Sequence, residues 1–342
     1  MSQKTTQIAN AAVEMYIKIL EIVYPTFLGT TIIAHSILLL FIIFFSPCHL
    51  KFLRILLLKT SIFDVLATVI NFYIQPRILA DRKENIPVYC YGLCQEMNTQ
   101  LCFSLYMAWQ NLSLAVGISM SYTLFFKYHK INGKGPLVGW RMFISMFLFY
   151  IPFFISTICS VIIVLRNTLP PMSRKVGDED DDEVEITDMR YSEIGRMTLG
   201  EIPNKVNFAM MSYGIYFSPI LAFWFRWKSN KNLKTTISGA SPYLQYHAKS
   251  VMTGLALQVF MHFIFYIPLF SLYLYSLYTG TEILFQQFFL AMSPNLAATF
   301  DPLINLYYVV PYRTRIKSWF ERSQPQQTSP LRVASITPSA IG

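Results

Sequence analysis

The chain has few charged residues for its length. Of its 342 residues, 14% are charged, 54% are hydrophobic and 16% are aromatic, and the mean hydropathy is +0.40. A soluble globular chain carries about 25% charged residues, so this chain lacks the polar surface that a water-exposed body requires. The composition therefore excludes a soluble enzyme or soluble binding module and predicts a membrane protein.

Cysteine is also scarce, with five residues in the whole chain and none in segment 166–205. A disulfide between the entry to the third apolar run and that segment is thus excluded. Of the cysteines, Cys90 and Cys94 lie clearly on the predicted outer side, and we expect either a bridge between them or two free thiols. No cysteine or histidine spacing resembles a metal site, and we expect neither a metal nor a cofactor.

A block of acids, "GDEDDDEVEITD", occupies residues 177–188 within segment 166–205. Like charges repel one another and bury no apolar area, so we expect a solvated extracellular loop over the mouth of the protein. The block has no glycine at the turn position of a calcium-binding loop, which argues against a calcium site.

Long apolar runs dominate the rest of the chain. A helix that crosses a bilayer needs roughly 20 mostly apolar residues. Seven such runs are present, at residues 22–45, 55–78, 99–126, 142–165, 206–227, 251–275 and 284–310. They lack the alternating pattern of membrane strands, and helices are then the remaining way to span a bilayer. The prediction is an all-α seven-transmembrane helix bundle over residues 22–310.

Basic residues are distributed unequally between the segments that join these runs. The segments after the first, third and fifth runs, together with the tail, hold 16 Lys and Arg and a single acid. The N-terminal segment and the segments after the second, fourth and sixth runs hold 11 basic residues and 16 acids. Basic loops stay in the cytoplasm, so residues 1–21 should be extracellular and the C-terminus cytoplasmic. The net charge of +9 is then a topology signal and not a sign of nucleic-acid binding.

The tail changes character after the last run. In "YRTRIKSWF" the apolar Tyr312, Ile316, Trp319 and Phe320 fall on one helical face and the basic residues on the other. This pattern predicts an amphipathic helix on the membrane surface at residues 311–322. Residues 323–342 are rich in Ser, Thr, Pro and Gln and are expected to be disordered.

Prolines recur in five of the seven runs, at Pro76, Pro152, Pro219, Pro268 and Pro302. Each should kink its helix and help to widen one end of the bundle into a cavity. A small-molecule ligand would then bind among inward-facing aromatic and polar residues, and the candidates are Tyr106, Gln110, Tyr213, Tyr216, His262 and Tyr266. Packing is the alternative interpretation of each of these residues.

Several motifs, taken in order, resemble one known family. "DPLINLYYVVPYR" is similar to the end of the seventh helix in rhodopsin-like receptors, and its P-Y-R form resembles nematode serpentine chemoreceptors of the Srd and Str type. "LLLKTSIFDVLATVINFYIQPRIL" resembles their second helix, "YGLCQEMNTQLC" the entry to their third, and "FYIP" the hinge of their sixth. The resemblance covers roughly residues 15–320.

The resemblance implies a G-protein-coupled chemosensory receptor in the cell membrane, in keeping with the ciliary membrane of sensory neurons. Its partners would be a small odorant or water-soluble ligand, a heterotrimeric G protein and the lipid bilayer. Residues that would face the G protein are Lys127, Tyr128, Arg226 and Lys249. The third run ends "YTLFFKYHK" and departs from the family, because it lacks the acid-Arg-Tyr triplet of rhodopsin-like receptors.

Two acids, Asp64 and Asp301, lie within apolar runs. A charged side chain in hydrocarbon is costly unless it faces the interior of the bundle, so both should point inward. We expect them to form, with Pro302 and Tyr307, a polar network that rearranges when the seventh helix moves. Static polar contact between helices is the alternative.

Other function classes remain open at this point. A seven-span ligand-gated channel would need the opposite orientation, and a transporter would more often show internal repeats and interrupted half-helices. An intramembrane enzyme would need a catalytic pair, and the context around Asp64 and Asp301 does not resemble one. We therefore expect a receptor and not an enzyme.

Overall fold

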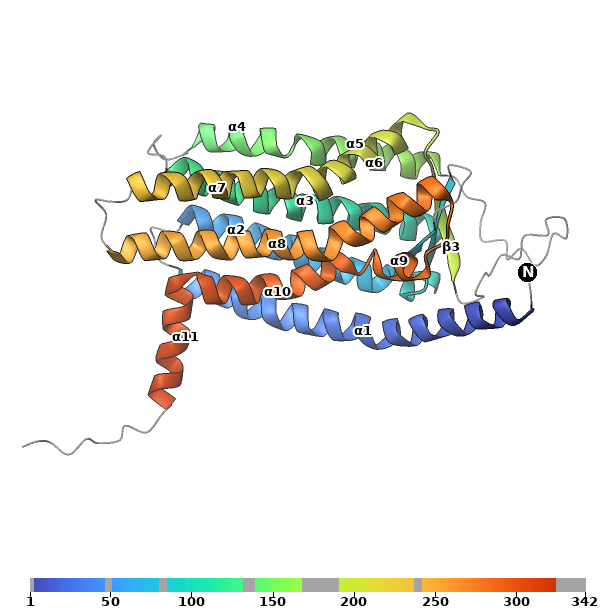
Figure 1. The fold of residues 1–342 in the computed structure, drawn as a ribbon, viewed down its shortest axis with the longest axis horizontal. Coiled ribbons are helices and arrows are strands. Elements are labelled where there is room, and N and C mark those ends of the chain that lie inside the picture. The colour runs from blue at the N-terminus through green and yellow to red at the C-terminus, as the bar shows by residue number, and fades with distance from the viewer. Residues whose placement is uncertain are drawn as a thin grey trace, which may run out of the picture.

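The described residues form seven helical segments that run side by side along the molecule (Figure 1). This computed structural model describes residues 3–46, 51–79, 85–96, 98–131, 139–167, 191–236 and 242–323. The first three segments are single helices, α1 (Gln3–Phe44), α2 (Lys51–Ile74) and α3 (Thr99–Ile131), and the sixth is α8 (Pro242–Thr279). The predicted helical bundle is confirmed.

The other three segments are interrupted. The fourth consists of α4 (Trp140–Phe149) and α5 (Ile151–Arg166), which meet at 53°. The fifth joins α6 (Ile202–Ser212) to α7 (Ser218–Thr236) through the π-helical turn η3 (Tyr213–Phe217), and the seventh joins α9 (Leu284–Phe289) to α10 (Ser293–Tyr308). A last helix, α11 (Val310–Ser323), leaves the bundle sideways (Figure 1).

The helices close into a ring around α3. Helix α1 packs against α2 and α10, α10 packs against α8, and α8 packs against α7. Helix α3 contacts α2, α5, α7 and α8 and therefore occupies the centre of the bundle.

Two of the five singled-out prolines lie at these interruptions. Pro152 is in the first turn of α5 directly after the bend, and Pro219 is the second residue of α7, directly after the π turn. Pro268 and Pro302 lie inside α8 and α10. The expectation for Pro76 is wrong, because α2 ends at Ile74 and Pro76 begins a strand. A proline removes the N–H of its own residue, so helices tolerate it best in the first turn.

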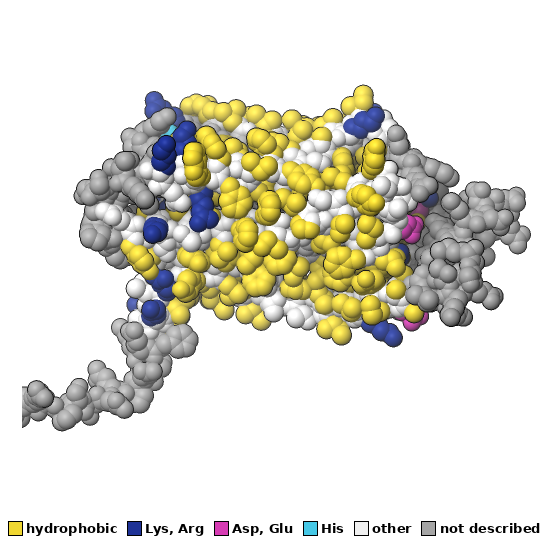
Figure 2. Space-filling view, viewed as in Figure 1, with side chains coloured by type: hydrophobic (Ala, Val, Ile, Leu, Met, Phe, Trp, Pro, Cys, Tyr) yellow, Lys and Arg dark blue, Asp and Glu magenta, His cyan; other side chains and the backbone are white. Residues whose placement is uncertain are grey.

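An apolar belt surrounds the middle of the bundle. Four stretches of the described residues are long and apolar enough to cross a membrane: Ala11–Phe44, Thr99–Lys130, Ile202–Lys231 and Gln245–Thr279. The bent α4–α5 pair makes a fifth if it is counted as one span. Hydrophobic side chains cover the visible face between the two ends, and Lys and Arg gather near the end where α11 leaves (Figure 2). Such a belt fits contact with lipid.

The N-terminal residues do not form a separate segment. Helix α1 begins at Gln3, so it extends the first predicted run by about five turns. Val13, Ile17 and Tyr24 are buried there against Phe288 and Met292 of the seventh segment. The first helix therefore starts well before residue 22, and residues 13–21 already contribute to the packing of the bundle. The extracellular position of residues 1–21 stays a prediction.

A three-stranded antiparallel sheet covers one end of the bundle, which we call the sheet end. Its strands are β1 (Pro76–Ile78), β2 (Asn85–Cys90) and β3 (Ser192–Thr198), in the order β1-β2-β3. The all-α prediction did not include this sheet. Ile86, Val88 and Ile194 are buried beneath it, each at most 2% exposed.

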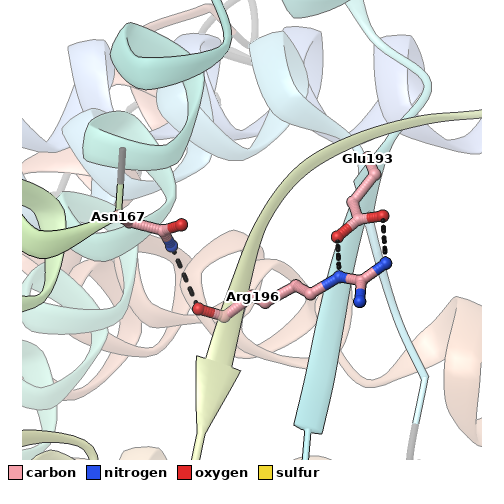
Figure 3. Close-up of polar contacts among 3 residues, drawn as sticks. All are labelled: Asn167, Glu193 and Arg196. Atoms are coloured by element: carbon pink, nitrogen blue, oxygen red, sulfur yellow. Dashed lines mark hydrogen bonds and ion pairs between the residues drawn. The ribbon is translucent and has the colours of Figure 1, made fainter. Parts of the chain in front are cut away.

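Strand β3 belongs to the segment that we expected to form a solvated loop. Its backbone is fixed instead: Asn167 Nδ2 donates to the Arg196 carbonyl over 3.0 Å, and the Arg196 side chain pairs with Glu193 (Figure 3). Gly195 lies against the Phe103 ring, where a Cβ atom would approach to 2.3 Å. The acidic block at residues 177–188 lies outside the described residues.

The disulfide that forms is neither of the expected alternatives. Cys94 pairs with Cys102, with 5.7 Å between their Cα atoms, and the bridge ties the short helix η2 (Leu93–Glu96) to the first turn of α3. Cys90 is buried and takes no part in this bridge; its Sγ lies 3.6 Å from Ser192 Oγ. Cys102 falls inside the third apolar run, and no pattern in that run predicts that it lies within reach of Cys94.

Candidate functional site

A cavity of about 50 Å³ lies under the sheet between α3, α6 and α8; we call it the upper cavity. Strands β2 and β3 contribute Ile86 and Met197 to its lining. The polar and aromatic lining residues are Tyr106, Trp109, Gln110, Asn204, Asn207, Phe208, Tyr266, Phe270 and Tyr273. Predominantly apolar walls with a few convergent polar groups are typical of small-molecule sites.

Hydrogen bonds hold one wall of the upper cavity in place. Gln110 Nε2 donates to Tyr106 Oη over 2.8 Å within α3. The Ser156 hydroxyl of α5 lies 2.6 Å from Asn207 Oδ1 and 2.7 Å from Asn111 Oδ1, so it joins α5 to both α6 and α3. Buried polar contacts of this kind fix the rotamers of the lining side chains.

A second cavity, of about 30 Å³, lies deeper in the bundle beside the π turn; we call it the middle cavity. Ser121 Oγ lies 2.6 Å from Ser218 Oγ, which in turn donates to the Gly117 carbonyl over 3.0 Å. Gly214 in the π turn packs on Leu114, where a Cβ atom would approach to 2.3 Å. The π turn therefore brings the fifth segment close to α3 at this depth, and such turns are frequent at functional sites.

A third cavity, of about 20 Å³, borders Asp64 of α2 and Asn295 of α10; we call it the lower cavity. Roughly 10 to 15 Å³ is enough for one water molecule, so this space can hold at least one. The three cavities share lining residues: Tyr266 borders all three, Met211 the upper and middle, and His262 and Ser113 the middle and lower. Together they form a column from the sheet to Asp64.

Both acids of the predicted network are buried, as expected from their cost in hydrocarbon. Asp64 is 3% exposed and Asp301 is 1% exposed. Asp64 Oδ2 and both carboxyl oxygens of Asp301 have no hydrogen-bond partner among the described residues, although Gln258 Nε2 lies 3.4 Å from the Asp301 backbone carbonyl. The site therefore contains polar atoms that the described part of the protein leaves unsatisfied.

The other two members of the predicted network separate. Pro302 is buried next to Asp301, but Tyr307 is 58% exposed on the outside of α10, where its ring lies 5.5 Å from the Arg313 guanidinium. Tyr307 is six positions beyond Asp301, which turns it away from the bundle interior. Asn305, four positions beyond Asp301, is 8% exposed and takes the inward place.

His35 joins three helices near the lower cavity, a role that the sequence did not indicate. Its Nε2–H donates to the Ala298 carbonyl of α10 over 3.0 Å, and its Nδ1 lies 2.6 Å from Ser61 Oγ of α2. The carbonyl can only accept, so Nε2 carries the proton in this arrangement. An isolated histidine in an apolar run gave no signal of its partners.

The structure brings together four of the six predicted ligand residues. Tyr106, Gln110, His262 and Tyr266 line the column. Tyr213 instead stacks on the exposed Phe217 with 4.9 Å between ring centroids, and Tyr216 Oη lies 2.8 Å from Ser271 Oγ of α8. Neither borders a cavity identified in the described part of the chain.

Several lining residues were missed. Asn204 and Asn207 lie three positions apart at the start of the fifth segment, and two amides on one face of an apolar helix could have signalled an inward-facing site. Ile86 and Met197 had no local signal, because only strand pairing brings β2 and β3 over the cavity.

The opposite end of the bundle, which we call the α11 end, carries the predicted G-protein-facing residues. Lys127 and Tyr128 lie at the end of α3, Arg226 on α7 and Lys249 on α8. The Tyr128 ring lies 5.6 Å from Phe225, and Lys228 Nζ lies 4.7 Å above Trp224. Phe126 stands where rhodopsin-like receptors have the acid, and it is buried at 6% exposure beside Tyr122. Aromatic packing therefore holds this end of α3.

Among the residues that the structure describes, no three His, Cys, Asp or Glu side chains come together as a metal site would require. A lipid-facing helix bundle with a buried column of cavities and a cationic end defines a class of protein, the seven-helix membrane receptors.

The comparison with known proteins agrees with this class. Residues 20–318 match the family described as "Serpentine type 7TM GPCR chemoreceptor Srd". The chain is 31% identical over 322 residues to serpentine receptor class delta-40 of Caenorhabditis elegans, which covers 93% of this chain and 98% of that protein. It is 30% identical over 327 residues to class delta-44 of the same organism, with 96% and 98% covered. The chain belongs to the Srd family of serpentine seven-transmembrane chemoreceptors, and it is a multi-pass membrane protein.

Proposed function

We propose that this chain is a chemosensory receptor that binds a small extracellular molecule in the upper cavity and activates a heterotrimeric G protein at the α11 end. The observation that carries the proposal is the column of three cavities, which leads from the sheet end to the buried acids. In this proposal the sheet end faces outward and the α11 end lies in the cytoplasm, because the basic segments belong to the α11 end.

Ligand binding can reach the buried acids through shared side chains. Tyr266 borders every cavity of the column, and it lies on α8 two positions before Pro268. A ligand that displaces Tyr266 would change packing around His262 and Asp64 as well. Helix α8 also contacts α7 and α10, so a shift of α8 would alter both neighbours.

The α11 end offers contacts that can separate without breaking secondary structure. Ser250 Oγ of α8 donates to the Tyr308 carbonyl of α10 over 2.7 Å, and the Arg313 guanidinium of α11 bonds to Tyr246 of α8. Gly254 packs on Tyr308, where a Cβ atom would approach to 2.5 Å. Movement of α8 away from α10 would open a cleft beside Lys127, Arg226 and Lys249, where a G protein could bind.

The direct test is second-messenger or calcium imaging in cells that express the chain, screened against volatile and water-soluble small molecules. Tyr266→Ala should abolish the response to an active compound, because it enlarges all three cavities. Tyr213→Ala is the matched control: the same residue type is removed, but its ring packs on exposed Phe217 outside the column.

Equal losses in Tyr266→Ala and Tyr213→Ala at equal surface level would contradict a ligand site in the column. A ligand-gated current that persists when G proteins are blocked would instead favour the channel alternative, and accumulation of the compound inside cells would favour a transporter. Localisation to the ciliary membrane of sensory neurons is part of the same proposal and is tested by imaging a tagged chain.

A further inference from the structure

The upper cavity is uncharged. None of its described lining residues is Asp, Glu, Lys, Arg or His. A charged ligand would lose its hydration there and would meet no opposite charge in the lining. The lining therefore disfavours ammonium and carboxylate ligands.

Two buried polar atoms of the lining have no hydrogen-bond partner in the described protein. Trp109 Nε1 belongs to a residue that is 2% exposed, and Asn204 Oδ1 to one that is 6% exposed. The first is a donor only and the second an acceptor only. Asn204 Nδ2 is already occupied, since it donates to the Thr198 carbonyl over 2.9 Å.

The neighbouring amides of the same cavity are satisfied. Gln110 donates to Tyr106, and Asn207 Oδ1 lies within hydrogen-bond distance of the Ser156 hydroxyl. Among the described lining residues, Trp109 and Asn204 are therefore the ones with a fully buried polar atom that lacks a partner. Buried donors and acceptors in native proteins are nearly always paired, so these two atoms are suited to bind a ligand.

The space below them is mostly apolar, although three serines and His262 also border it. The middle cavity adjoins the upper one through Met211 and Tyr266, and Leu114, Ile215 and Val259 contribute to its walls. A molecule that fills both cavities would carry its polar group at the sheet end and a short hydrocarbon body toward the π turn. The volumes of about 50 and 30 Å³ limit it to few heavy atoms unless side chains move.

We propose that the upper cavity binds a small uncharged molecule with a hydroxyl group, whose oxygen accepts from Trp109 Nε1–H and whose hydrogen is donated to Asn204 Oδ1. This inference rests on the proposed function and specifies its ligand class. A ketone can meet Trp109 but cannot donate to Asn204, so it should bind more weakly than the matching alcohol.

The test is thermal stabilisation of the purified full chain in lipid discs by four probes of one carbon skeleton: an alcohol, a ketone, an amine and a carboxylate. A bound molecule raises the melting temperature by an amount that grows with the logarithm of its concentration divided by its Kd, so each Kd is obtained from a concentration series. The alcohol should bind best and the ketone about two- to tenfold more weakly, which is the range of one neutral hydrogen bond. The amine and the carboxylate should not stabilise the protein.

Two variants separate the two hydrogen bonds. Trp109→Phe keeps an aromatic ring but removes the donor, and it should weaken both the alcohol and the ketone about two- to tenfold. Asn204→Ala removes the acceptor, and it should weaken the alcohol to the level of the ketone without changing ketone affinity.

Matched controls remove the same chemical groups elsewhere. Trp140→Phe changes a tryptophan that is 71% exposed on α4. Asn167→Ala removes an amide that, like Asn204, donates to a carbonyl of β3, at Arg196, but does not line the cavity (Figure 3). Both should bind the alcohol as the parent does.

Each outcome decides a separate claim. Preferred binding of the amine or carboxylate, no binding of any probe, or alcohol affinity unchanged in both Trp109→Phe and Asn204→Ala would overturn the ligand assignment. The receptor proposal would survive these results if other compounds signal in cells. Conversely, if alcohols bind as described but no compound activates a G protein, the proposed function fails while the assignment of the cavity stands.

Discussion

The two ends of the bundle are stabilised by different kinds of contact. At the sheet end, strand pairing, the Cys94–Cys102 bridge and backbone contact at Gly92 fix the chain around the upper cavity. At the α11 end, the described helices meet through aromatic rings, cations and single side-chain hydrogen bonds. Backbone pairing and a covalent bridge restrict movement, whereas side-chain contacts can exchange partners. The sheet end is therefore the more rigid end, and the α11 end is the more adaptable one.

The assignment of the two ends to the two sides of the membrane gives an all-or-none prediction. An epitope tag at residue 3 should be stained on intact cells, and one at residue 340 should be stained only after permeabilisation. Lys and Arg in short loops resist translocation, which is the physical reason for this orientation. The reversed staining pattern would remove the receptor proposal and favour the channel.

Gly92 should tolerate no side chain at the rigid end. An added Cβ atom would lie 2.2 Å from the Tyr73 carbonyl oxygen, and backbone cannot move aside as a flexible side chain can. Gly92→Ala should destabilise the protein by more than about 3 kcal/mol, measured as surface level and melting temperature. Gly29→Ala in α1 is the control, because nothing lies within 4 Å of its Cβ position, and it should be neutral or stabilising. Equal behaviour of the two variants would mean that the contact at Gly92 relaxes.

Loss of the bridge should weaken the same end by a smaller amount. The Cys94→Ser variant cannot form the bridge. Because Cys94 and Cys102 are eight residues apart, the loop-entropy model gives a loss of about 2 to 3 kcal/mol in the free energy of unfolding. The measurement is the melting temperature with and without reductant. Cys159→Ser, at a free cysteine on α5, is the control: it keeps the bridge, so its melting temperature should equal that of the parent both with and without reductant, whereas reductant should not change the melting temperature of Cys94→Ser. A Cys94→Ser protein as stable as the parent would show that the sheet alone orders this end.

The buried acids lie between the two ends and distinguish a switch from static packing. Asp301→Leu removes a carboxyl group whose oxygens lack partners in the described protein, so we expect a gain in stability of about 1 to 3 kcal/mol together with impaired signalling. A loss of stability would point to bound water or another partner at this carboxyl.

Asp301→Asn and Asp64→Asn should alter signalling non-additively when combined, because residues of one network are coupled. Surface level and signalling would be measured for both single variants and the double variant. Strictly additive losses would leave two independent packing roles.

The smallest effect is expected at the adaptable end. The double variant Lys127→Gln with Lys249→Gln should reduce signalling severalfold and leave the surface level unchanged. Each substitution should remove the binding free energy of about one hydrogen bond to the G protein. Lys18→Gln with Lys205→Gln, two cations of the sheet-end segments, is the matched control. Unchanged signalling in the first pair would place coupling elsewhere on the inner face.

Patterns that depend on composition could be read from the sequence because the bilayer imposes them on each segment separately. Apolar runs long enough to span hydrocarbon predicted the helices, and the cost of an acid in lipid predicted that Asp64 and Asp301 face inward. The resemblance of the motifs around Asp64 and Asp301 predicted the family, which the comparison confirms.

Only the tertiary structure decided which residues that are apart in the sequence come into contact. Strand pairing brought residues 85–90 and 192–198 over the upper cavity, the start of α3 placed Cys102 rather than Cys90 beside Cys94, and helix rotation turned Tyr307 outward and Asn305 inward. These outcomes depend on contacts between residues separated by up to about a hundred positions, and local propensity carries no information about such contacts. The apolar runs of the sequence determined the helical segments and their composition, and packing determined where those segments break and which side chains share the cavity.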